Sequence, residues 1–111
     1  MYRERLEILE NWKGYVRRVA VAAVTLLEGC EVYAFGSIIS GRRTAASDID
    51  VLVMAESLPD ALMERAKVKE DVEKLAGLPP YHPIQIHLVT KDETRHSSIY
   101  SKAVREGQKL T

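Results

Sequence analysis

Two aspartates separated by one residue, Asp48 and Asp50, are the side chains of this sequence best suited to chemistry. They stand near the start of a short apolar run, 47–53, which is typical of a buried β-strand. On a strand, side chains two apart project from the same face, roughly 6.6–7 Å from one another. Paired carboxylates bind hard cations such as Mg²⁺, which prefer oxygen ligands. We therefore expect this strand to present a metal site.

A glycine–serine pair, Gly36-Ser37, follows an earlier apolar run at 31–35 that also predicts a strand. Glycine has no Cβ, so the backbone can approach a ligand closely there. Ser37 can donate its hydroxyl and its backbone N–H to a phosphate. A short helix is expected to start in the residues that follow, 38–40, and its N-terminal amides favour an anion. A Gly-Ser pair alone is also typical of an ordinary turn, and the aspartates downstream are what favour the phosphate interpretation.

The aspartates have a structural alternative, in which Asp48 is a solvated strand-start cap and Asp50 pairs with an arginine. Burying two unpaired carboxylates close together is costly, so a divalent cation that neutralises both explains them better. The loop between the two strands carries Arg42 and Arg43. These guanidinium groups could contact triphosphate oxygens bidentately, or they could be solvated surface charges.

A third strand is predicted over 84–89, where apolar and polar residues alternate. Gln85 and His87 share one face of this strand. His87 has a side chain suited to general-base catalysis, and it is equally consistent with an ordinary half-buried histidine. The sequence leaves these two interpretations open.

The pattern Gly36-Ser37, ten residues, Asp48-x-Asp50 resembles the signature of the DNA polymerase β-like nucleotidyltransferase superfamily. Ser47, directly before Asp48, is part of this resemblance, which covers about 32–54 and extends more weakly to the third strand. The short chain is similar to the minimal nucleotidyltransferases of prokaryotes. Many of those are encoded beside a HEPN-domain protein as a toxin–antitoxin pair.

The resemblance implies an Mg²⁺-dependent transfer of a nucleoside monophosphate from an NTP, with ATP and AMP favoured, to a hydroxyl acceptor. Asp48 and Asp50 would hold the metal, and the nucleotide would be bound by Gly36, Ser37, Arg42, Arg43 and Ser47. The acceptor site would come from a partner chain, such as a HEPN-type toxin. The alternative is an inactive nucleotide-binding antitoxin module. A small-molecule transferase acting on an aminoglycoside-like acceptor is a weaker third candidate.

Two positions depart from the family pattern. Gln85 stands where many members carry a third carboxylate, which completes the metal cluster and acts as a base. A glutamine carbonyl can bind a metal but can neither carry charge nor take a proton. Ile39 stands where members often carry a basic residue. We therefore expect one well-ordered metal and slow or absent turnover, with His87 as the candidate replacement base.

Length and composition limit the classes of protein to which this chain can belong. The 111 residues suit one domain, 1–111, and the 16 basic and 16 acidic residues cancel, so no global charge draws the chain to nucleic acid. The lone Cys30 cannot form an internal disulfide and fits a reducing compartment. No apolar run is long enough to span a membrane. We expect a cytoplasmic protein, and the sequence does not exclude a homo-oligomer.

The remaining periodicity predicts an α/β fold of the polymerase β-like nucleotidyltransferase type. A long helix is expected over 3–28, with Gly14 marking a bend and Gly29 the end. Further helices are expected over 60–76 and around 99–105. The sheet should be small and mixed, with about three strands and helices on one face.

Overall fold

The computed structural model describes residues 2–41 and 48–111. Its centre is a mixed four-stranded sheet with the order β3-β2-β1-β4. The strands are β1 (Glu31–Phe35), β2 (Ile49–Ala55), β3 (Ile84–Thr90) and β4 (Gln108–Lys109). β1 pairs antiparallel with β2 and β4, whereas β2 and β3 run parallel. The predicted α/β fold is confirmed, with one short strand more than expected.

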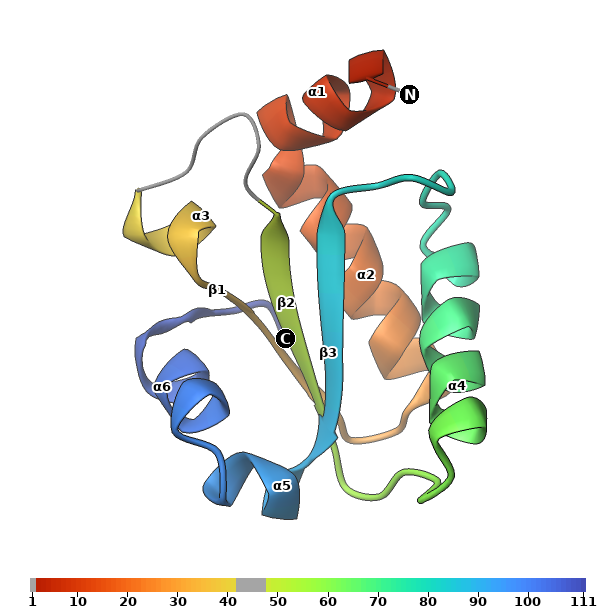
Figure 1. Cartoon of the computed structure of the whole chain (residues 1–111), viewed down its shortest axis with the longest axis vertical. Coiled ribbons are helices and arrows are strands. Elements are labelled where there is room, and N and C mark those ends of the chain that lie inside the picture. The colour runs from red at the N-terminus through yellow and green to blue at the C-terminus, as the bar shows by residue number, and fades with distance from the viewer. Residues whose placement is uncertain (1, 42–47) are drawn as a thin grey trace.

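Six helices surround this sheet in the described part of the chain (Figure 1). They are α1 (Tyr2–Glu10), α2 (Trp12–Leu26), α3 (Ser37–Ser40), α4 (Leu62–Leu75), α5 (Lys91–Arg95) and α6 (Ser98–Glu106). α4 connects the parallel strands β2 and β3, as a parallel pair requires a crossover. None of the described helices is both long enough and apolar enough to span a bilayer.

The predicted N-terminal helix is broken in two, and the break lies at Asn11 rather than at Gly14. Asn11 has a non-helical backbone (φ −113°, ψ 31°), and its side-chain amide donates to the Glu7 carbonyl at 3.0 Å. Asparagine side chains compete with the backbone for such hydrogen bonds, which favours a helix boundary. Gly14 lies inside α2, so its missing side chain causes no bend. The break separates α1 from α2 and gives each its own direction (Figure 1).

One face of the sheet packs against α1, α2 and α4. Every second residue of the central strands lies in this core, as Val32, Val51 and Val53 do, each with no exposed surface. Val19 of α2 and Val72 of α4 are equally buried and belong to the same cluster. Burial of a valine side chain contributes about 1.5–3 kcal/mol, so this layer is the main source of stability.

The opposite face is covered by α6, which corrects the expectation of helices on one face only. Tyr33, Leu52 and Met54 project from this face and form a second buried cluster with Ala103 of α6. The chain then turns at Gly107, where a Cβ would lie 2.4 Å from the Ala103 carbonyl oxygen and 2.7 Å from that of Ala34. The glycine thus lets the backbone run close enough to β1 to form β4.

Candidate functional site

The Gly36 turn lies directly against the carboxylate of Asp50. Phe35, the last residue of β1, is the register partner of Asp50 on β2. A Cβ at Gly36 would be only 2.6 Å from Oδ2 of Asp50, and the Gly36 backbone (φ 80°, ψ −152°) lies in a region that is essentially restricted to glycine. The short helix expected after Ser37 is present as α3, and it begins one residue earlier, at Ser37 itself. The structure therefore brings together the turn and one of the two aspartates.

Asp48 and Asp50 both keep access to solvent. Their side chains are 47% and 30% exposed. Asp48 lies 3.4 Å from an Arg5 guanidinium nitrogen, and Oδ1 of Asp50 lies 3.0 Å from Nε2 of His87. The structural alternative predicted an arginine as the partner of Asp50. Among the described residues, the side chain that pairs with Asp50 is His87. The Asp48–Arg5 ion pair is exposed, and such pairs contribute at most about 1 kcal/mol, so it would not prevent a bound cation from taking the Asp48 oxygens. The Asp50–His87 contact is half-buried and uses Oδ1, which leaves Oδ2 facing the turn.

The histidine predicted as a candidate base is held between two side chains. Nε2 of His87 faces Asp50, and its Nδ1 lies 3.0 Å from the hydroxyl of Tyr100 on α6. The Phe35 ring packs against the imidazole with the two ring centroids 5.1 Å apart. These contacts fix the ring on the same face of the sheet as Asp50.

Gln85 lies beside Asp50 on the neighbouring strand. The two residues are register partners in the parallel β2–β3 ladder, and Gln85 is exposed. Neighbouring strands are about 4.7–4.9 Å apart, so a carboxylate at position 85 would stand next to Asp50. The structure thus places a neutral amide where the family pattern has a third acid.

The donor set suits one divalent cation that is shared with a ligand. In residues 2–41 and 48–111, no three or more His, Cys, Asp or Glu side chains are grouped so that they could hold a metal ion. Mg²⁺ usually takes one or two carboxylates and completes its shell with water and substrate phosphates. Asp50, with the open Gly36 turn against its carboxylate, fits that requirement as one ligand. Asp48, two residues earlier and 47% exposed, has a second carboxylate that is open to solvent.

A cavity of about 680 Å³ opens beside the turn. Its walls come from the β1–α3 junction and from α6, and its lining residues are Phe35, Gly36, Ile39, Ser40, Ile99, Lys102, Ala103, Glu106 and Gly107. This volume falls in the range of small-molecule sites, about 300–1,000 Å³. Ile39, in place of a basic residue, gives this wall an apolar character. The cavity therefore offers space for a ligand next to the carboxylates.

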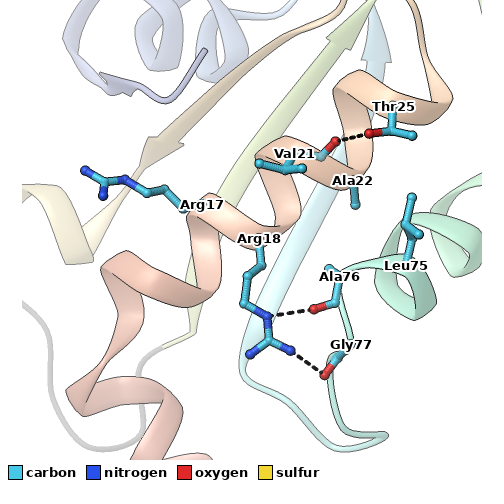
Figure 2. A pocket seen from close by; sticks show the side chains of 8 residues that line it. All are labelled: Arg17, Arg18, Val21, Ala22, Thr25, Leu75, Ala76 and Gly77. Carbon is cyan, nitrogen blue, oxygen red and sulfur yellow. Dashed lines mark hydrogen bonds between the residues drawn. The ribbon is translucent and has the colours of Figure 1, made fainter.

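A second cavity, of about 490 Å³, lies between α2 and α4 (Figure 2). The Arg18 guanidinium crosses it and donates to the carbonyl oxygens of Ala76 at 2.9 Å and Gly77 at 3.0 Å. Arg18 thereby caps the C-terminal end of α4 with a charge that the helix dipole favours. None of the predicted site residues that the structure describes lines this cavity.

Two other reactive side chains, those of Cys30 and His82, lie where they contribute to the fold. Cys30 is 7% exposed, and burial raises the pKa of its thiol, so it is a poor nucleophile. His82 is paired with Glu73 and accepts the Ile84 N–H at its Nδ1. It thereby holds the start of β3 to α4.

Three of the predicted site residues lie outside the part of the chain that the structure describes, and three residues that contact the site were not predicted. Arg42, Arg43 and Ser47 lie outside the described residues. Arg5 and Tyr100 contact the site residues but carry no local motif, because each reaches the site from a distant part of the sequence. Phe35 had a local signal, since it stands at the end of the first strand, directly before the turn.

Comparison with solved structures shows the same fold in other proteins. A candidate nucleotidyltransferase from Sulfolobus solfataricus is 16% identical, with a TM-score of 0.59 over 86% of this chain and 78% of that chain. A second candidate nucleotidyltransferase is 22% identical, with a TM-score of 0.57 over 88% and 99% of the two chains. A toxin–antitoxin structure with AMP-PNP is 18% identical, with a TM-score of 0.54 over 86% and 72%. At these identities the likeness concerns the fold alone.

Sequence comparison defines the family. No curated protein matches the sequence. The nucleotidyltransferase domain model, however, matches residues 16–110, which include both strands of the predicted signature. This match confirms the superfamily that the Gly36-Ser37 and Asp48-x-Asp50 pattern predicts, while the pairing with a HEPN-type partner stays a prediction. The chain therefore belongs to the nucleotidyltransferase domain family.

Proposed function

We propose that this protein transfers a nucleoside monophosphate, AMP from ATP in the favoured case, to a hydroxyl acceptor in an Mg²⁺-dependent reaction. The observation that carries the proposal is the contact between the Gly36 turn and Oδ2 of Asp50. It joins a backbone turn suited to phosphate with a carboxylate suited to a cation. Family membership supports nucleotidyl transfer in general. The metal, the nucleotide and the acceptor belong to the proposal.

Each side chain has a role in this proposal. Asp48 and Asp50 would hold the divalent cation, which when bound neutralises charge on the phosphate oxygens. Gly36 lets the phosphates approach the backbone, and Ser37 donates to them. The cavity beside the turn would take the nucleoside, with Arg42, Arg43 and Ser47 as further predicted nucleotide contacts. His87 would accept the proton of the attacking hydroxyl at Nδ1, where that hydroxyl would take the place of the Tyr100 hydroxyl.

The acceptor is proposed to lie on a partner protein. One of the structures with this fold is a toxin–antitoxin structure with AMP-PNP, which supports a toxin as that partner. A tyrosine hydroxyl of a HEPN-type toxin is the specific acceptor we propose. The partner's mass after co-expression, and after incubation with ATP and Mg²⁺, should rise by one or more AMP groups. An unmodified partner would contradict the enzymatic form of this pairing.

An inactive nucleotide-binding module is the second candidate, and Gln85 favours it. Gln85 stands beside Asp50 without a charge. A site with two carboxylates can still hold a metal–nucleotide complex. It lacks the third acid that many members use as a base, so His87 would have to replace that function. An antitoxin that acts by occlusion alone needs no such replacement.

Calorimetric titration with an ATP analogue that has a methylene bridge between its α and β phosphates tests the nucleotide site. We expect binding only when Mg²⁺ is present, with one metal ion bound per chain, because the described site offers two carboxylates. Pyrophosphate release from ATP, measured on the same protein, separates the two candidates: binding with release supports the transferase, and binding without release supports the inactive module. Two tightly bound metal ions per chain would contradict the one-metal arrangement.

Gln85→Asp is expected to increase turnover by about 10- to 100-fold, because it restores a charged oxygen ligand and a proton acceptor beside Asp50. Pyrophosphate release and Mg²⁺ stoichiometry measure the effect, and a second metal ion should appear. Gln108→Asp, a change at an exposed position on β4, is the matched control and should leave both quantities unchanged. If Gln85→Asp behaves like this control, position 85 is not part of the metal site.

A further inference from the structure

Tyr100 reaches the site from α6, far along the chain from the predicted motif. Its hydroxyl lies 3.0 Å from Nδ1 of His87, whose Nε2 lies 3.0 Å from Oδ1 of Asp50. The ring of Tyr100 contacts those of His87 and Phe35, with centroid separations of 5.5 Å and 6.5 Å. The phenol is half-buried rather than sealed in the core. It is thus a hydroxyl in a fixed position next to the candidate base.

The direction of the hydrogen bonds follows from the chemistry of the three groups. An ionised carboxylate only accepts hydrogen bonds, so Nε2 of a neutral His87 ring must carry the hydrogen and donate it to Asp50. Nδ1 is then the acceptor, and the Tyr100 hydroxyl is the donor. A nucleophile bonded to a base that is itself oriented by a third group is the general arrangement of an activated hydroxyl. Tyr100, His87 and Asp50 have this arrangement.

We propose that the Tyr100 hydroxyl is itself an acceptor, so that the chain attaches a nucleoside monophosphate to its own α6. The inference rests on the proposed function, since an NTP bound at the Gly36 turn supplies the group. The Tyr100 O–H proton passes to Nδ1 of His87, and a bond forms between the phenolic oxygen and the α-phosphorus. The bond from that phosphorus to the bridging oxygen breaks, and pyrophosphate leaves with the electron pair. The product is a tyrosyl phosphodiester.

The surroundings of Tyr100 are consistent with such a step. Ile99, the preceding residue, is 66% exposed and lines the cavity that also contains Gly36 and Phe35. A nucleotide in this cavity would therefore lie between the Gly36 turn and the helix that carries Tyr100. The modified tyrosine has no hydroxyl hydrogen, so it could no longer donate to His87. Modification would thus also remove a link between α6 and the sheet.

Intact-mass measurement of the full-length chain, before and after incubation with ATP and Mg²⁺, tests the proposal. We expect the mass to rise by one AMP group and peptide mapping to locate it at Tyr100. Tyr100→Phe keeps the ring and should abolish the adduct. Tyr81→Phe removes a hydroxyl from a 69% exposed tyrosine outside the site and should leave the adduct intact. Thermal unfolding of each variant shows whether it is folded.

Binding of the methylene-bridged ATP analogue, measured in parallel, separates this inference from the proposed function. Nucleotide binding without any adduct on the wild-type chain would overturn self-modification while leaving the nucleotide site in place. An adduct that persists in Tyr100→Phe would also overturn it, because another residue would be the acceptor. Absence of both binding and adduct would overturn the inference together with the proposed function.

Discussion

Asp50→Asn is expected to reduce nucleotidyl transfer by about 10³-fold, because metal-ion stabilisation of the phosphoryl transition state contributes several kcal/mol. Asp50 is the carboxylate that touches both halves of the site, with Oδ2 against Gly36 and Oδ1 against His87. Asparagine has nearly the same shape and can still accept a hydrogen bond from His87. The fold should therefore be retained, with a change in unfolding free energy of about 1 kcal/mol or less.

The measurements are pyrophosphate release, Mg²⁺ affinity by calorimetry and unfolding by denaturant. Asp92→Asn is the matched control, because Asp92 is 77% exposed on α5, where its nearest charged partners are Arg95 at 3.8 Å and His96 at 4.0 Å. That variant should leave release and Mg²⁺ affinity unchanged. Wild-type Mg²⁺ affinity in a folded Asp50→Asn protein would show that this carboxylate does not hold the cation.

Gly36→Ala should destabilise the protein by about 1–3 kcal/mol and abolish nucleotide binding. Two independent effects act at this position. The backbone (φ 80°, ψ −152°) lies in a region that strongly disfavours any side chain. The added methyl group would also lie 2.6 Å from Oδ2 of Asp50, so the turn or the carboxylate must move. Either movement separates the phosphate-binding turn from the metal ligand.

Gly41→Ala is the control for backbone strain alone. Gly41 also has a positive φ, of 77°, but no described atom lies within 4 Å of where its Cβ would be. We expect Gly41→Ala to lose stability by a similar or smaller amount and to keep nucleotide binding. Denaturant unfolding and calorimetric binding distinguish the two variants. Equal nucleotide affinity in Gly36→Ala and Gly41→Ala would contradict the role assigned to the Gly36–Asp50 contact.

The elements that form the site follow from local patterns in the sequence. β1 and β3 were predicted to within a residue and β2 to within about two, because short β-branched runs bounded by turn residues have few other conformations. The alternation of β2 also placed Asp50 on the face opposite Val51 and Val53. β1 ends at Phe35, which pairs with Asp50 of β2, so the Gly36 turn lies next to β2.

Other features were missed because they depend on contacts between distant segments. The break at Asn11 has a weak local signal, since asparagine is only mildly unfavourable in a helix. β4 has two residues and forms only because Gly107 lets the chain approach Ala34. α6 was expected as a charged helix, but its apolar side covers the second face of the sheet. Nothing in the local composition indicates which sheet face a tail helix will cover.

The sequence by itself determined the strands, the glycine turn and the pair of aspartates, because these depend on backbone preferences and on a period of two residues. Only the tertiary structure decided what surrounds them. It brought Arg5 to Asp48 across 43 positions and His87 to Asp50 across 37. It also set Tyr100 against His87 through the packing of α6. Such neighbours are selected by burial and register over the whole sheet, which no local pattern encodes.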